Sequence, residues 1–121
     1  MKIHFSVQKF DLTPELEKYA SVKVIRLVRR LPRRPRSTAD CHIHFSQRQK
    51  KDVKFNTCSL TLKLADAELQ ATETTQHMYA ALDIAVVHIE QQIRDYETRR
   101  ESRFKNELKR RIQAEWRPPE A

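Results

Sequence analysis

The sequence KIHFSVQKFDLTPELEKYASVKVIRL, residues 2–27, predicts a strand that is followed directly by a helix. In residues 2–8 the apolar side chains of Ile3, Phe5 and Val7 alternate with polar side chains. A period of two is typical of a strand with one buried face. We therefore expect a half-buried strand at the start of the chain.

A strong helix start follows this strand. Thr13 can act as the N-cap, and Pro14 suits the first helical position because a backbone N–H has no partner there in any case. Apolar residues then recur at steps of three and four, which indicates a face buried in a core. This stripe contains Leu16, Ala20, Val24, Leu27 and Leu31. Pro32 and Pro35 are expected to end the helix.

Three more strands are predicted in the middle of the chain. Apolar and polar residues alternate over 38–48, 53–64 and 67–74. The polar sequence QRQKKD, residues 47–52, forms a hairpin turn between the first two of these strands, and Ala65-Asp66 joins the second to the third. The short spacings favour antiparallel neighbours.

From Thr75 onward we predict a long second helix. Its core stripe contains Met78, Leu82, Ala85, Val86, Ile89, Ile93 and Tyr96. Arg100 occupies the next core position, so the stripe ends near Tyr96. An offset apolar series continues at steps of four, and it contains Phe104, Leu108, Ile112 and Trp116.

The predicted fold class is α+β, with a single β-α-β-β-β-α domain. The first strand, its crossover helix and the next strand form a βαβ unit, so these two strands should be parallel in an otherwise antiparallel, four-stranded mixed sheet. Both helices must then cover the same face. The open face would carry His4, His42, His44, Thr57, Thr61 and Gln70. We divide the chain into a domain over residues 1–100 and a basic, helical C-terminal extension over residues 101–121.

Length and composition exclude several classes of protein. The 121 residues suffice for one domain, and without any glycine neither a P-loop nor a Rossmann phosphate loop can form. No run approaches the ~20 apolar residues of a membrane-spanning helix, and no secretory signal is visible. Two cysteines, Cys41 and Cys58, are fewer than a disulfide-stapled secreted domain would use. We expect a cytoplasmic chain with both thiols buried.

The net charge of +8 comes from one segment. Residues 18–36 contain eight basic residues and no acidic residue. Eight like charges repel one another, and such a patch is the usual footprint of nucleic-acid binding. An acidic membrane surface fits less well, because the segment has no Trp or Phe anchor.

The sequence contains no catalytic motif, neither a nucleophile motif nor a His-Glu metal motif. His42 and His44 lie two apart on one strand face, with His4 beside them, so three imidazoles could bind a metal. No carboxylate or cysteine of that face completes such a site, and a polar sheet face is the favoured interpretation. Asp66 and Glu68 lie at a turn without a partner. We predict a protein that is not an enzyme and uses no cofactor or metal.

Three separated segments resemble one known family. MYAALD at residues 78–83, followed by Ile89 and Gln92-Ile93, resembles the second-helix signature of the ribosome hibernation promoting factors, whose family includes ribosome-associated inhibitor A. Residues 2–27 resemble the family's first strand and helix, and residues 67–71 its last strand. The resemblance covers residues 1–100 and is to the short form of the family.

The resemblance implies a fold like that of a double-stranded-RNA-binding domain with an added strand. It also implies binding to the small ribosomal subunit in stationary or stressed cells, in the channel that mRNA and the A- and P-site tRNAs would use. Translation would stop there. The partners would be that subunit and its rRNA, with no membrane and no small-molecule substrate, and the free protein would be monomeric.

Basic residues of both family helices contact rRNA phosphates, and Lys23 and Arg26 fall on such positions. The second helix departs from the family, because basic positions are taken by His88, Gln91, Asp95 and Glu97, and His77 replaces an Asp. We expect rRNA contact to shift toward the first helix and the loop after it. The predicted rRNA-binding residues are Lys18, Lys23, Arg26, Arg29, Arg30, Arg33, Arg34, Arg36, His88, Arg94, Arg99 and Arg100.

Two alternative functions remain open at this point. The first is a double-stranded-RNA-binding module that acts off the ribosome by reading A-form shape. The second is an adaptor protein that binds a partner through the apolar series of residues 104–116. We expect this series to be mobile in the free protein and to order against a partner, because it is too long for the domain's own core to cover.

Overall fold

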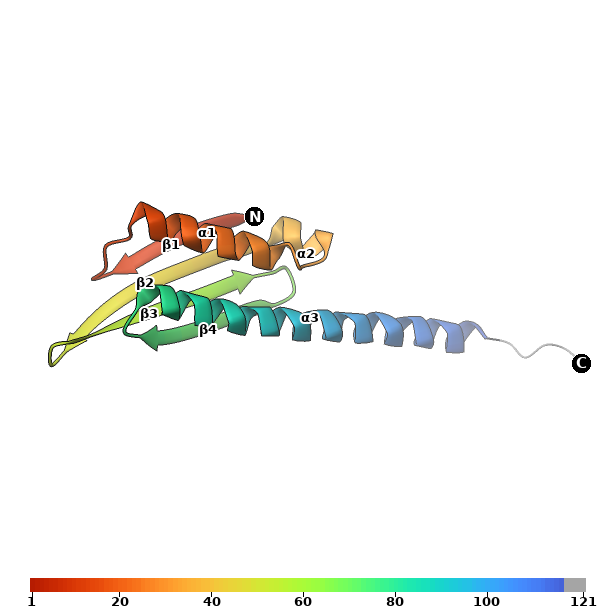
Figure 1. The fold of residues 1–121 in the computed structure, drawn as a ribbon. Coiled ribbons are helices and arrows are strands. Elements are labelled where there is room, and N and C mark those ends of the chain that lie inside the picture. The colour runs from red at the N-terminus through yellow and green to blue at the C-terminus, as the bar shows by residue number, and fades with distance from the viewer. Residues whose placement is uncertain (117–121) are drawn as a thin grey trace, which may run out of the picture.

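The computed structural model describes residues 1–116, which form one four-stranded sheet with helices on one face (Figure 1). The elements are β1 (Lys2–Gln8), α1 (Pro14–Val28), α2 (Arg33–Thr38), β2 (Asp40–Lys50), β3 (Val53–Lys63), β4 (Glu68–Thr75) and α3 (Met78–Glu115). The strand order is β1-β2-β3-β4, with β1 and β2 parallel and the other pairs antiparallel. The predicted α+β class and mixed sheet are confirmed.

The register places polar side chains on the open face of the sheet, as predicted. His4 of β1 is opposite His42 of β2, and the row continues through Thr61 of β3 to Gln70 of β4. In the next row Ser6 lies opposite His44. The alternation along each strand then turns the apolar side chains toward the helices.

The core lies between the sheet and the inner faces of α1 and α3. Phe45, Leu82 and Ile89 are completely buried there. Both cysteines belong to this core and are free thiols, as expected. Burial raises the pKa of Cys41 and of Cys58 to about 12, because an apolar environment disfavours the thiolate.

The segment after α1 differs from the prediction. The helix ends at Val28 and not at Leu31, and a short helix, α2, replaces the expected loop. Leu31 still reaches the core, because its N–H bonds to the Val28 carbonyl in a tight turn. Pro32 then caps α2, and Pro35 is tolerated in its first turn because an N–H at that position would have no intrahelical partner.

The β2–β3 hairpin is also tighter than the six-residue turn predicted. The strands run to Lys50 and resume at Val53, so the turn consists of Lys51 and Asp52 alone. Both have positive φ, 48° and 63°, as a two-residue hairpin turn of type I′ requires. The chain makes this turn without glycine, at the conformational cost of two left-handed non-glycine residues.

The second long helix begins at Met78, three residues later than predicted, and continues without a break to Glu115. Figure 1 shows its C-terminal part projecting well past the sheet. The projecting apolar side chains are exposed, and Phe104 is 67% and Trp116 64% accessible. The division at residue 100 and the mobility of the extension stay predictions, and residues 117–121 lie outside the described part.

Truncation after Arg100 is expected to shift the Tm of the domain by no more than about 3 °C. Residues 101–116 are all exposed, so their removal uncovers little of the core. Differential scanning calorimetry of the full chain and of the truncated chain would measure the shift. A larger loss of Tm would show that the extension packs against the domain.

Asn56 is the one polar residue buried among the described residues, with 6% of its surface exposed. Its Oδ1 accepts a hydrogen bond from Gln47 Nε2 at 2.8 Å, and its Nδ2 donates to the Gln76 carbonyl at 2.9 Å. The amide therefore joins β2 and β3 to the connection that leads into α3.

The Asn56→Ala variant is expected to lose ~1–3 kcal/mol of unfolding free energy, because the Gln76 carbonyl and the Gln47 amide would lose a buried partner. Urea denaturation would measure the loss. Gln49→Ala, at an exposed position of the same hairpin, provides the control and should change little. Equal midpoints for the two variants would contradict this role.

The free edge of β4 is partly covered by a side chain of α3. Gln92 Oε1 accepts a hydrogen bond from the Gln70 N–H at 3.1 Å, and Gln92 Nε2 donates to the Gln70 carbonyl at 2.8 Å. The side-chain amide therefore pairs with the strand as another backbone peptide group would.

Candidate nucleic-acid interface

The outer face of α1 carries basic and apolar side chains together. Lys18, Arg26 and Arg29 are exposed on it. Val22 and Ile25, which do not fit the core stripe, lie on this face and are 41% and 38% exposed. Lys18, Val22 and Arg26 line one shallow hollow of about 430 Å³ together with Lys23. The face therefore offers positive charge with apolar surface between the cations.

Lys23 of α1 reaches toward α3. Its Nζ is 3.7 Å from Asp83 Oδ1, and it lies over the Tyr19 ring at 5.3 Å. Tyr19 Oη donates to the same carboxylate oxygen at 2.7 Å. This hydrogen bond is the main reason that the pKa of Tyr19 is raised. Lys23 is thus partly neutralised within its own chain.

Arg30, about two helical turns after Lys23 of α1, has a similar partner. Its Nη2 is 3.6 Å from Glu90 Oε1 of α3. The two pairs, Lys23 with Asp83 and Arg30 with Glu90, run in the same direction along both helices. Their order shows that α1 and α3 run parallel, and each pair reduces the positive charge that its cation presents to a partner.

The α1–α2 corner concentrates the remaining cations of the basic segment. Arg29, Arg33 and Arg36 line a second hollow of about 430 Å³ beside Ile25. Arg36 also has a structural role, because its Nη2 donates to the Arg29 and Leu31 carbonyls at 3.2 and 3.0 Å. Carbonyls at the end of a helix lack intrahelical partners, so this contact fixes the corner.

The predicted residues of α3 are dispersed. His88 turns toward the sheet, where its Nε2 is 2.9 Å from Glu73 Oε1 of β4. Arg99 donates to the Asp95 carbonyl within its own helix. Arg94 is exposed, and only Arg100 approaches the corner, where it shares a hollow with Arg34 and another with Arg29, Arg30 and Arg36.

The structure thus unites the basic residues of α1, α2 and Arg100, and it does not bring His88 to them. Within residues 1–116, Lys18, Arg26, Arg29 and Arg33 have no acidic partner at ion-pair distance. Such unpaired cations are what a phosphate backbone attracts. Sequence reasoning did not include Phe104 and Lys105 among the site residues, although both line the hollow of Arg100. The four-residue spacing of Arg100 and Phe104 was the available signal.

On the open face, His42 and His44 contact the Ser6 hydroxyl and His4 contacts the Asp40 carboxylate, so the expectation that no carboxylate shares this face is wrong. Ser6 Oγ is 3.0 Å from His42 Nε2 and 2.6 Å from His44 Nδ1, and His4 Nε2 is 3.1 Å from Asp40 Oδ1. Residues 1–116 contain no group of three or more side chains that could hold a metal ion.

In the same residues no helix has both the length and the apolar character needed to cross a membrane.

Two solved structures share this fold. A ribosomal subunit interface protein from Coxiella burnetii is 23% identical, with a TM-score of 0.64, and the match covers 81% of this chain and 99% of that one. The Protein Y N-terminal domain from Thermus thermophilus is 20% identical, with a TM-score of 0.65, and the match covers 79% of this chain and 99% of that one.

A family model matches nearly the whole domain. It is described as sigma 54 modulation protein / S30EA ribosomal protein, and it matches residues 3–101. The match spans every strand, α1, α2 and the part of α3 that covers the sheet. The chain therefore belongs to the sigma 54 modulation protein / S30EA ribosomal protein family.

Proposed function

We propose that this ribosome-associated protein is a hibernation factor that binds the small ribosomal subunit and blocks translation. The observation that carries the proposal is the set of unpaired cations on the outer face of α1 and at the α1–α2 corner, in a chain of this family. These cations would contact rRNA phosphates. The core beneath them is closely packed, so the helical face would act as a preformed wedge.

The mechanism is occupancy. A rigid domain in the channel of mRNA and of the A- and P-site tRNAs would exclude these ligands without any chemical step, so the proposal requires neither catalysis nor a cofactor. Affinity would come mainly from the release of counterions from rRNA, and it would therefore fall steeply with salt. We further expect the free protein to be a monomer and to act in the cytoplasm of stressed or stationary-phase cells.

Sedimentation with purified subunits tests the proposal. The protein should move with the small subunit in a sucrose gradient, and excess mRNA with tRNA should displace it. It should also inhibit cell-free translation at stoichiometric amounts. Binding to plain duplex RNA with equal affinity, and no displacement by mRNA and tRNA, would instead favour a double-stranded-RNA-binding module that acts off the ribosome.

A further inference from the structure

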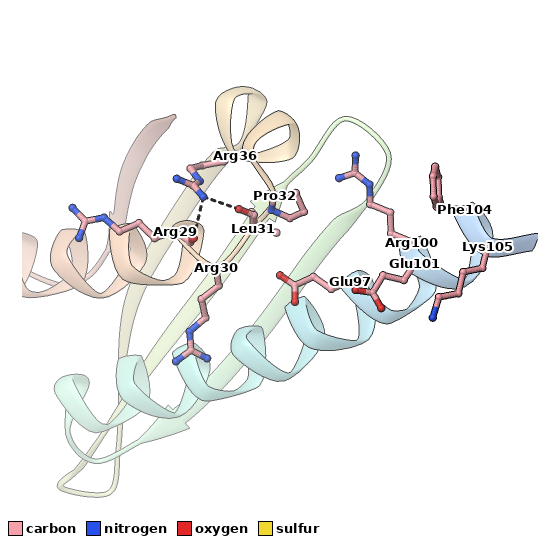
Figure 2. A pocket seen from close by; sticks show the side chains of 10 residues that line it. All are labelled: Arg29, Arg30, Leu31, Pro32, Arg36, Glu97, Arg100, Glu101, Phe104 and Lys105. Carbon is pink, nitrogen blue, oxygen red and sulfur yellow. Dashed lines mark hydrogen bonds between the residues drawn. The ribbon is translucent and has the colours of Figure 1, made fainter. Parts of the chain in front are cut away.

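A cleft of about 870 Å³ lies where the projecting part of α3 passes the α1–α2 corner (Figure 2). Its volume is within the range of ~300–1,000 Å³ that is usual for small-ligand sites. Five basic side chains line it: Arg29, Arg30, Arg36, Arg100 and Lys105. Two acidic side chains, Glu97 and Glu101, and the ring of Phe104 complete the polar and aromatic lining.

One wall of the cleft lies outside the part of the chain that matches the family. The family match ends at residue 101, whereas Phe104 and Lys105 follow it. The matches to the two solved structures cover 81% and 79% of this chain. The cleft exists because α3 continues past the sheet, so a ligand for it has to be inferred from its own chemistry.

The upper part of the cleft combines cations with an exposed aromatic ring. Arg100 and Phe104 are one helical turn apart, and Figure 2 shows both side chains leaving the same side of α3. Phe104 is 67% exposed, so one face of its ring is free to stack. Arg36 lines the cleft from the corner, where its hydrogen bonds to the Arg29 and Leu31 carbonyls hold its guanidinium on the Arg29 side, away from Arg100 (Figure 2). A nucleic-acid base that stacks on an aromatic ring, with its phosphate on a cation, is a recurrent binding mode of single strands.

The acidic residues distinguish a nucleotide from a bare anion. Figure 2 shows Glu97 and Glu101 pointing away from Phe104, toward the side on which Arg30 lies. Carboxylates accept hydrogen bonds from the exocyclic amino groups of bases, as in the pairing of Glu with cytosine N4. They would repel inorganic phosphate. The phosphate of a nucleotide therefore matches the basic side chains, its flat base matches the ring of Phe104, and the amino group of the base matches the carboxylates.

We propose that this cleft binds a single unpaired nucleotide of RNA. Phe104 stacks on the base, Arg100 holds the phosphate, and the base reaches across α3 so that its amino group meets Glu101, three residues before Phe104. The nucleotide must be unpaired, because the bases of a duplex are covered by their stacked neighbours. The inference rests on the proposed function, in that ribosomal RNA would supply the nucleotide.

Fluorescence anisotropy with a labelled eight-nucleotide cytidine RNA tests the inference in the full chain. Phe104→Ala should weaken binding about tenfold or more, since stacking on one aromatic ring contributes that much. The slope of affinity against salt should stay unchanged, because no charge is lost. Leu108→Ala is the matched control, since this residue is 48% exposed on the same projecting helix and does not line the cleft. It should bind within about twofold of the wild type.

Three further arms make the inference specific. Wild-type protein should bind the cytidine RNA more tightly than an eight-nucleotide uridine RNA, and Glu97→Gln combined with Glu101→Gln should reduce this preference. A blunt RNA duplex should bind equally to wild type and Phe104→Ala. Free cytidine monophosphate should compete only at far higher concentration than the oligomer, and equal competition would assign the cleft to a free nucleotide and overturn the inference.

The inference and the proposed function fail separately. If the wild type sediments with the small subunit but Phe104→Ala binds the cytidine RNA as the wild type does, the nucleotide site alone is wrong. If Phe104→Ala loses the cytidine RNA while the wild type does not sediment with the subunit, the proposed function alone is wrong.

Discussion

Replacing Leu82 with Ala is expected to lower the free energy of unfolding by ~2–5 kcal/mol. Leu82 is completely buried on the inner face of α3, within the core cluster between helix and sheet. Truncation to Ala removes buried methyl groups and leaves a cavity that closely packed neighbours fill only in part. Urea or guanidinium denaturation, followed by far-ultraviolet circular dichroism, would measure the loss.

Val87 provides the matched control for this variant. It lies on the same helix but is 58% exposed, so Val87→Ala should change the unfolding free energy by no more than ~0.5 kcal/mol. Equal denaturation midpoints for Leu82→Ala and Val87→Ala would show that the inner face of α3 is assigned incorrectly.

Removal of the unpaired cations should have the largest effect on ribosome binding. The variant combines Lys18→Ala, Arg26→Ala, Arg29→Ala and Arg33→Ala. Each phosphate contact contributes ~0.9 to the slope of log affinity against log salt on duplex RNA-like targets, so four contacts should reduce the slope by ~3–4. The same four contacts correspond to a loss of roughly 10²–10³-fold in affinity near physiological salt. Sedimentation or filter binding with small subunits at several salt concentrations would measure both quantities.

Four lysines of the sheet supply a control with the same change in net charge. Replacing Lys50, Lys51, Lys54 and Lys63 with Ala removes charge from the strands and hairpin and leaves the α1–α2 corner intact. A general effect of net charge would weaken both variants equally. Binding of the α1 variant with wild-type slope and affinity would refute the proposed rRNA-binding face.

Periodicity was sufficient to predict most of the fold. The alternation of residues 2–8 and the helix start at Thr13 and Pro14 define a βαβ unit, whose parallel pairing the register of β1 and β2 confirms. Local chemistry was not sufficient to predict α2. Pro32 and Pro35 are helix-ending signals in a linear pattern, yet Pro32 suits the N-cap and Pro35 the first turn of a new helix once Leu31 is buried.

The sequence was sufficient to predict which basic residues form the candidate site, but not which of them form ion pairs with α3. The absence of acids in residues 18–36 predicts an uncompensated basic surface. It does not predict that Asp83 and Glu90 of α3 lie beside Lys23 and Arg30, because such long-range pairs depend on the alignment of two helices. The cleft beside Phe104 could not be predicted from the sequence either, because it forms only where a continuous α3 passes the α1–α2 corner.

The contact between Gln92 and Gln70 has a consequence for the association of separate copies of this protein. An open sheet edge is a template on which another molecule can add its own strand, and this addition is a common route to aggregates. Here the N–H and the carbonyl that an incoming strand would need are already bonded to a side chain of the same molecule. Growth of the sheet at β4 would first have to displace that amide, so a single glutamine helps to keep each copy of the protein separate.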